Sequence, residues 1–260
     1  MHKTVAEAVA TVQQLQELVK SVTAREVAVC PPATALYAVG QALQTSGSRI
    51  ALGAQDLFWE EKGAYTGLIS PAMLKDAGCK YVIIGHSERR GRFGKPDHSV
   101  TPEMMSVFGD NDATVNRKLK AALTAGLRPI LCVGETFQER LANWTDLIIR
   151  GQLARAFFGL PTERLAEIVV AYEPVWAIGT GEACEPAEAN RVLGQMRKIV
   201  KQEWGEALAG EVRLLYGGSV EEKNAGVIME QAEIDGVLVG GASLDAGRFA
   251  RIVTAGLSPA

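Results

Sequence analysis

The sequence of 260 residues contains few of the residues that build metal centres or disulfide frameworks. It has only three histidines and four cysteines, and the cysteines lie far apart, with no C-x-x-C pair, at Cys30, Cys79, Cys132 and Cys184. This scatter argues against bound metal and against a disulfide framework, and it fits the reducing environment of the cytoplasm. We therefore expect no metal site and a cytoplasmic protein.

The chain also lacks an apolar stretch of membrane length, a signal-like N-terminus and an excess of basic residues. Lys and Arg number 27 against 30 Asp and Glu, which gives a net charge of −3. This balance argues against nucleic acid as an obligatory partner, although it leaves room for a local basic pocket. We expect neither a membrane nor a nucleic-acid partner. The hydrophobic content of 47% is ordinary for a chain that buries a sizeable core.

Short apolar runs alternate with segments of helical periodicity along the whole chain. The runs predict strands at 27–30, 50–56, 81–84, 129–133, 168–172, 213–216 and 236–239. The other segments predict helices at 5–20, 34–45, 71–78, 113–125, 137–158, 186–204, 223–231 and 247–255. Repeated strand–helix units with short connections favour a parallel sheet covered by helices, and a long series favours a (β/α)₈ barrel over a doubly wound sheet. Since no Pro/Gly/Ser-rich linker interrupts the series, we expect residues 1–260 to form a single domain.

The stretch from Ile168 to Gly181 combines a buried strand, one carboxylate and a glycine-rich tip. The apolar run ends directly before Glu173, and Pro174 prevents a helix from following. The tip at 177–181 contains too many small residues to be core, and we expect a loop that can move. A lone acid at a strand end is often merely solvated. In a barrel, however, the C-terminal ends of the strands build the active site.

Other strand ends carry glycines and polar residues. Gly217-Gly218-Ser219 and Gly240-Gly241 each follow a predicted strand. Glycine lets the backbone approach a phosphate closely, so that consecutive N–H groups can point at one dianion, and a helix beginning after Gly241 would add its dipole. The alternative is that these glycines only make tight turns. Glycine pairs on neighbouring strands favour the phosphate site.

His86 directly follows the strand at 81–84 and precedes Ser87–Arg90, which resembles a helix start. The N–H dipoles at such a start favour a neutral imidazole, which could donate a hydrogen bond to a substrate oxygen. Together with Glu173 across the barrel mouth, His86 predicts proton abstraction beside a carbonyl group, with Glu173 as the base. The isolated histidines offer no competing metal cluster.

Several motifs, taken in order along the chain, resemble the triosephosphate isomerase family. They are Ile84–Arg90, Cys132–Thr136, Ala171–Gly181, Tyr216–Ser219 and Val239–Ser243. The resemblance implies interconversion of dihydroxyacetone phosphate and D-glyceraldehyde 3-phosphate through an enediolate, without a cofactor, in a homodimer. It implies Glu173 as the base and His86 as the electrophile, a well-known pairing in this family. It also implies that the 174–181 loop closes over the intermediate, and that the phosphate is bound by Gly179, Ser219, Gly240 and Gly241.

The chain departs from the family pattern at its start. The family begins with a strand that ends in Asn-Trp-Lys-Met, and Met1 resembles that methionine. We therefore expect the first strand to be missing, together with the substrate-binding Asn and the active-site Lys, because Lys3 falls two positions too late. The loss of one charge stabiliser typically lowers the rate by ~10²–10³. The lost strand would also leave unpaired edges, so we expect weak or no activity from an open or perturbed barrel.

Two further departures concern loops. Residues 91–107 form an insertion after the family's fourth strand, and we expect either a solvated, flexible segment or a contact with a partner subunit. Leu68 stands where the family usually carries Glu, in the loop with Thr66 that the resemblance implies docks into a second subunit.

The functional alternatives therefore remain open. The motifs favour a triose-phosphate isomerase. The alternative is a barrel that binds phosphate esters but is catalytically impaired, because the lysine is absent. Another phosphate-handling barrel enzyme is disfavoured by Glu173-Pro-Val-Trp176.

Overall fold

The computed structural model describes residues 1–94, 101, 103–104, 109–178, 180, 182 and 184–257. Its strands form one seven-stranded sheet in chain order, and all neighbouring pairs are parallel. The strands are β1 (Ala28–Val29), β2 (Ala51–Ala54), β3 (Tyr81–Ile84), β4 (Arg128–Val133), β5 (Val169–Tyr172), β6 (Arg213–Tyr216) and β7 (Gly236–Val237).

Helices separate the strands. The α-helices are α1 (Val5–Val19), α2 (Leu36–Thr45), α3 (Pro71–Asp76), α5 (Asp112–Thr124), α6 (Phe137–Leu141), α7 (Thr145–Phe157), α8 (Thr162–Leu165), α9 (Pro186–Trp204), α10 (Glu206–Glu211), α11 (Ala225–Met229) and α12 (Ala246–Thr254). Single 3₁₀ turns form η1 (Ala33–Ala35), η2 (Val175–Ala177) and η3 (Gly241–Leu244). Within the described residues, no helix is both long and apolar enough to cross a membrane.

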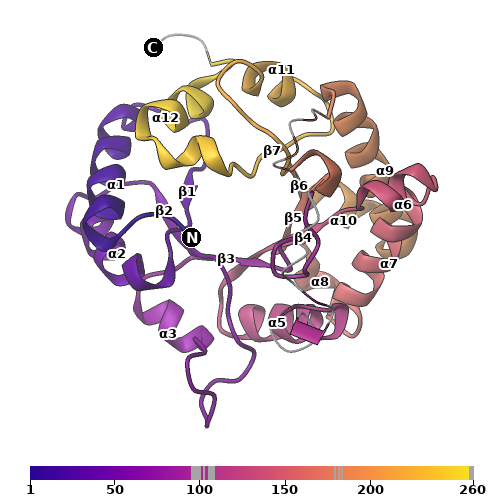
Figure 1. Ribbon diagram of the computed structural model, residues 1–260, viewed down its shortest axis with the longest axis horizontal. Coiled ribbons are helices and arrows are strands. Elements are labelled where there is room, and N and C mark those ends of the chain that lie inside the picture. Colours follow the sequence, from indigo (N-terminus) through magenta and orange to yellow (C-terminus); the bar gives the residue numbers. More distant parts are fainter. Residues whose placement is uncertain are drawn as a thin grey trace.

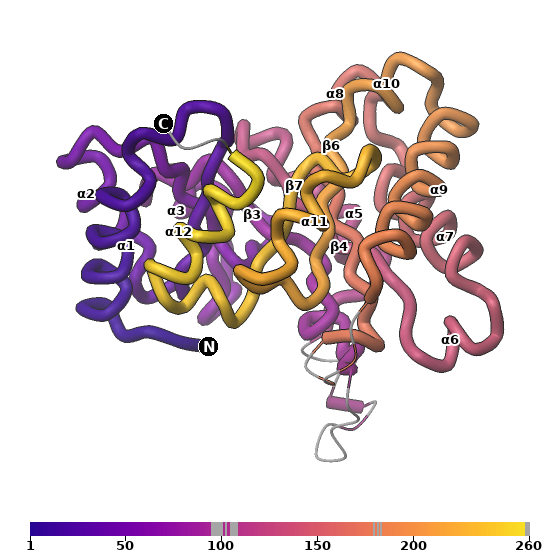
Figure 2. Tube along the Cα trace, turned by 90° about the horizontal axis from the view of Figure 1, so that it is seen from above, coloured from indigo at the N-terminus to yellow at the C-terminus, as the bar shows by residue number. Residues whose placement is uncertain are grey.

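The helices form a ring around the strands (Figure 1), which is the layout of the predicted α/β TIM barrel. Helix α1 packs against both α2 and α12, so the two ends of the helix series meet. Figure 2 shows the ring from the side, with α1, α2 and α12 at one end and α7 and α9 at the other. Among the described residues, no pairing joins β7 to β1, so each of these strands keeps one free edge.

Along each strand, one residue faces the barrel interior and the next faces the surrounding helices. The interior cluster consists of Tyr81, Ile130, Cys132, Val169 and Ala171. Their chain neighbours on the same strands belong to the larger cluster between the sheet and the helices. Because both faces of the sheet are covered, the strand sequences are continuously apolar rather than alternating.

Most element bounds lie within a few residues of the sequence-based prediction, with informative differences. The helix predicted at 137–158 is divided into α6 and α7, because Asn143 adopts a φ of 59° and ends the first helix. Ser87–Arg90 forms a turn and not the start of a helix, so that prediction was wrong. The short helices α8 and α10 were not predicted.

Candidate active site

Glu173 extends the inward-facing series of β5. It follows Val169 and Ala171 at two-residue spacing, and its backbone N–H donates to the Val133 carbonyl oxygen at 2.8 Å, which prolongs the pairing of β5 with β4. The side chain therefore points into the barrel mouth at the C-terminal ends of the strands. It is only 2% exposed.

Glycines let the neighbouring strand ends approach this carboxylate. A Cβ on Gly134 would overlap the carbonyl oxygen of Glu173, and a Cβ on Gly217 would lie 3.2 Å from its Cγ. Gln152 of α7 holds Gly134 in place, because its Oε1 accepts a hydrogen bond from the Gly134 N–H at 2.8 Å. The amide of Gln152 also donates to the Gly134 carbonyl oxygen at 3.2 Å. Only a residue without a side chain fits between Gln152 and Glu173.

The turn after β3 brings His86 to Glu173. His86 Nε2 lies 2.9 Å from Glu173 Oε1, while Glu173 Oε2 accepts from the Ser87 backbone N–H at 2.9 Å. His86 Nδ1 accepts from the Glu88 N–H at 3.3 Å. A nitrogen that accepts carries no proton, so the ring proton belongs on Nε2, which faces the carboxylate. The structure thus brings together the two residues that the sequence analysis paired.

Opposing effects act on the protonation of His86. Burial of the ring lowers the pKa of His86, but the close contact with Glu173 and the charges of Glu173 and Glu88 outweigh it, so the pKa is raised above its ordinary value. Within the described residues, Glu173 Oε1 accepts no well-aligned hydrogen bond, although His86 Nε2 lies 2.9 Å from it.

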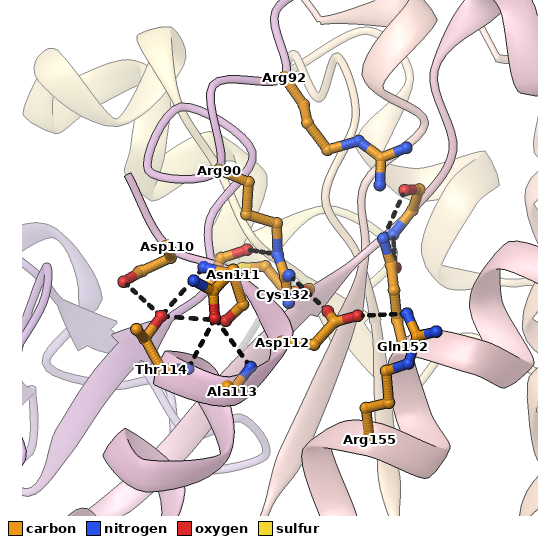
Figure 3. A network of polar contacts seen from close by, with 12 residues as sticks. Arg90, Arg92, Asp110, Asn111, Asp112, Ala113, Thr114, Cys132, Gln152 and Arg155 are labelled. Carbon is orange, nitrogen blue, oxygen red and sulfur yellow. Dashed lines mark hydrogen bonds and ion pairs between the residues drawn. The ribbon is translucent and has the colours of Figure 1, made fainter. Parts of the chain in front are cut away.

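Arg90 fixes the turn that carries His86 (Figure 3). Its guanidinium donates to the carbonyl oxygens of Gly85 at 2.7 Å and Cys132 at 3.5 Å, and it pairs with Asp112 at 3.0 Å. Asp112 lies in the first turn of α5, which Asn111 caps. One buried cation therefore joins the ends of β3 and β4 to the start of α5.

Glu135 holds the chain that follows Glu173. Its Oε1 accepts from Tyr172 Oη at 3.0 Å and from Trp176 Nε1 at 2.9 Å, and its backbone carbonyl accepts from the Val175 N–H at 3.2 Å. The side chain is fully buried, and this burial raises the pKa of the Glu135 carboxyl. The sequence showed an acid at this strand end but carried no signal that it anchors the neighbouring loop.

The described part of the loop after Glu173 is packed. Val175, Trp176 and Ala177 are all buried, and Arg140 lies over the Trp176 ring at 4.3 Å. Ser219 Oγ donates to the Ala177 carbonyl oxygen at 3.3 Å, so the turn after β6 touches this loop. The predicted residue Gly179 lies outside the described residues.

The other predicted phosphate ligands follow β6 and β7. Tyr216 pairs with Val237, so Ser219 and the Gly240-Gly241 pair belong to neighbouring strand ends. Gly240 and Gly241 are exposed and have open space where a Cβ would lie. Gly241 begins η3, so a helical turn starts where the sequence analysis expected a helix, although it is a 3₁₀ turn.

The start of the 91–107 insertion lies against the same loop. A Cβ on Gly94 would overlap the Ile178 carbonyl oxygen, and Arg92 pairs with Glu139 of α6. Most of the remaining insertion, 95–100, 102 and 105–107, lies outside the described residues. In the part of the chain that is described, no group of three or more His, Cys, Asp or Glu could hold a metal ion.

Comparison with known proteins shows which family this chain resembles. Residues 1–256 match the family model described as "Triosephosphate isomerase". The chain is 50% identical over 253 residues to the triosephosphate isomerase of Moorella thermoacetica and 46% identical over 253 residues to that of Chloroflexus aurantiacus, covering 97% of this chain and 94% of each relative. The crystal structure of triosephosphate isomerase from Bartonella henselae is similar with a TM-score of 0.81 and 35% identity, over 98% of this chain and 94% of that chain.

Proposed function

Since the chain belongs to the triosephosphate isomerase family and is a triose-phosphate isomerase of glycolysis and gluconeogenesis, we propose that Glu173 and His86 carry out its proton transfer. One observation carries the assignment. Glu173 Oε1 lies 2.9 Å from His86 Nε2 at the barrel mouth, next to the glycine turns after β6 and β7. A base and a hydrogen-bond donor that meet at the barrel mouth can act on adjacent atoms of a small carbonyl substrate once it lies between them.

In the proposed reaction, Glu173 removes a proton from the carbon beside the carbonyl group of dihydroxyacetone phosphate. The electrons of that C–H bond form the C–C double bond of the enediolate, and negative charge develops on the former carbonyl oxygen. His86 stabilises this oxygen through its Nε2 proton, which the Glu88 N–H keeps on that side of the ring by occupying Nδ1. A proton then passes from the hydroxyl group on the first carbon to the former carbonyl oxygen, and the protonated Glu173 returns its proton to the carbon that bears this oxygen, which gives D-glyceraldehyde 3-phosphate.

The substrate must separate the two side chains. Without it, the base and the donor contact each other directly, and this contact raises the pKa of His86 against the effect of burial. A substrate that lies between them would weaken the interactions with Glu173 that raise this pKa, and burial would then favour the neutral ring that the reaction needs. This accounts for the neutral histidine that we expect during catalysis.

Phosphate binding and loop closure complete the proposal. We assign the phosphate to the backbone groups of Ser219, Gly240 and Gly241, together with Gly179 of the loop. The open space beside Gly240 and Gly241 supports this, because a phosphate could reach the backbone there. The packed segment Val175–Ala177 would form the fixed base of the 174–181 loop, whose tip would close and exclude water from the enediolate.

A coupled assay and isotope exchange test this assignment. The chain should convert dihydroxyacetone phosphate to D-glyceraldehyde 3-phosphate and incorporate deuterium from D₂O at the reacting carbons. Glu173→Gln should lose both activities by about 10²–10⁴, the range for a general base, at an unchanged melting temperature. Full exchange in Glu173→Gln would assign the base to another residue.

We further propose that the family's first strand, with its Asn and Lys, belongs between β1 and β7. The free edges of these strands support this, because a barrel normally pairs every edge. A version that carries an Asn-Trp-Lys strand in this gap should turn over about 10²–10³ faster than a version without it. Equal rates would refute this part of the proposal.

The assembly we propose is a homodimer of single-domain subunits (residues 1–260, with 91–107 as an insertion) in the cytoplasm. The loop between β2 and α3 projects from the barrel (Figure 1) and exposes Tyr65 and Leu68. Exposed apolar groups on a projecting loop suit a protein interface. Light scattering should give the mass of two chains, and Tyr65→Asp with Leu68→Asp should give one chain if this loop is the interface.

A further inference from the structure

At the N-terminal end of the barrel, away from the catalytic residues, lies a cavity of about 280 Å³. The end of α1, the turn after α2 and the segment leading into β1 surround it. Active sites of such barrels lie at the opposite end of the strands, so the reaction makes no use of this cavity. We propose that it is a second binding site, for the phosphate group of a small phosphate monoester.

The charge of the cavity lining matches a dianion. Lys20, Arg25 and Arg49 line it, and Glu17 is the one carboxylate among the lining residues. Three cations against one anion leave a local excess of two positive charges, whereas the whole chain carries −3. A cavity of this charge in an acidic protein concentrates small anions rather than repelling them.

Arg25 lacks a carboxylate partner such as those beside Arg197 and Arg213, which are also partly buried. Its one hydrogen bond in the described part of the structure goes to the Val253 carbonyl oxygen, at 2.6 Å. Burial lowers the pKa of Arg25. For Arg197 the carboxylates of Asp235 and Glu233, and for Arg213 the Tyr81 hydroxyl and Glu26, outweigh burial and raise the pKa. A phosphate in the cavity would supply the missing counter-charge.

Further donors face the same space. Arg49 is exposed and has no hydrogen bond or ion pair within the described residues. Ser48 Oγ accepts from the Ile50 N–H at 3.2 Å, which leaves its own proton free to donate. Guanidinium and hydroxyl donors together are a suitable set for phosphate oxygens.

The remaining wall is apolar and sets the ligand class. Val19, Val22, Val27 and Ile50 form this apolar part, and Gln16, Ser46 and Gly47 complete the lining. The cavity is at the lower end of the range for small-molecule sites. The fit is therefore to a phosphate group with a short carbon chain and not to a nucleotide.

Backbone amide NMR of the ¹⁵N-labelled chain tests the proposal, with inorganic phosphate and n-propyl phosphate as probes at constant ionic strength. The amides of 46–50 should shift and saturate, and propyl phosphate should bind more tightly than phosphate because its chain reaches the valines. In Lys20→Gln/Arg49→Gln these shifts should saturate about tenfold more weakly, as expected for lost charge-assisted hydrogen bonds. The shifts of Gly240 and Gly241 should persist.

Lys198→Gln is the matched control, because Lys198 is exposed on α9 and does not line the cavity. It should bind like the parent chain, and both variants should keep the parent's melting temperature and isomerase activity. Shifts at 46–50 that do not saturate, that NaCl reproduces, or that survive in Lys20→Gln/Arg49→Gln would overturn the proposal. None of these results would affect the assignment of Glu173 and His86, which the isomerase assay measures separately.

Discussion

Glu173 Oε1 lies 2.9 Å from His86 Nε2, so the proposed base and the proposed electrophile contact each other directly when no substrate is present. This contact, together with the charges of Glu173 and Glu88, is what raises the pKa of His86 against burial. The protonation of His86 therefore depends on where the Glu173 side chain lies. A group that separates the two residues changes the electrostatics of the site as well as its shape.

We predict that Glu173→Gln lowers the pKa of His86 below that of the parent chain. The neutral amide removes a charge and a charged acceptor, and burial of the ring then acts with less opposition. NMR titration of the His86 ring measures the change directly. Glu88→Gln serves as the comparison and should lower the pKa less, since the charge of Glu88 contributes least. An equal or higher pKa in Glu173→Gln would contradict the structure.

The same shift predicts the pH dependence of stability. A histidine whose pKa is higher in the folded than in the unfolded chain binds more protons when folded. Its contribution to the free energy of unfolding is complete below the ordinary value of 6.5 and is lost as the pH rises through the raised value. Denaturant unfolding from pH 6 upward should show this loss in the parent chain and less of it in Glu173→Gln. If the unfolding free energy of both proteins changed with pH in the same way, the contact between His86 and Glu173 would not be the source of the loss.

Glu135 provides a pair of substitutions with opposite outcomes. Both buried donors, Tyr172 Oη and Trp176 Nε1, point at Oε1, and Oε2 has no partner among the described residues. Glu135→Gln can keep Oε1 as the acceptor and removes a buried charge, so we expect stability at pH 7 at least equal to the parent's. Glu135→Leu leaves both donors unpaired, at a cost of about 1–3 kcal/mol for each.

Denaturant unfolding and the isomerase assay together check this prediction. Because Glu135 holds the base of the loop, Glu135→Leu should also lower kcat/KM, whereas Glu135→Gln should largely retain it. Glu163→Gln, at an exposed position in α8, controls for the loss of one negative charge. A Glu135→Leu variant with the stability and kcat/KM of the parent chain would show that the loop does not depend on these hydrogen bonds.

Much of this fold follows from local sequence, and the site follows from it only in part. The continuously apolar runs predicted the strands because both sheet faces are buried, and Ser70 caps α3 through the Met73 N–H as its position before Pro71 suggests. The pairing of His86 with Glu173 also followed, since barrel geometry places strand ends on one rim. The role of Glu135 did not, because its partners lie 37 and 41 residues away in the chain. The sequence analysis also missed the left-handed conformation of Asn143 that divides α6 from α7, although asparagine is one of the few residues other than glycine that adopt it readily.

Arg90 and Arg155 both pair with Asp112, but at different depths (Figure 3). The Arg90 side chain is 7% exposed and also donates to two carbonyl oxygens, while the Arg155 side chain is 72% exposed. Arg90→Gln should therefore lower the free energy of unfolding by about 3 kcal/mol or more, as for a broken buried pair. Arg155→Gln should change it by about 0–1 kcal/mol. If both variants lost a similar amount of unfolding free energy, the contribution of this cluster to stability would depend on Asp112 and not on the depth of its arginine partner.

Gly134 and Gly151 test whether close backbone approach builds the catalytic site. A Cβ on Gly134 would overlap the Glu173 carbonyl oxygen, which is backbone and cannot rotate away, whereas a Cβ on Gly151 meets nothing within 4 Å. Gly134→Ala should therefore displace Glu173 from His86 and lower both the melting temperature and kcat. Gly151→Ala lies within α7, where alanine should stabilise the helix by roughly 0.5–1 kcal/mol without changing kcat. If Gly134→Ala kept the parent's kcat, the position of Glu173 would not depend on the strand end beside it.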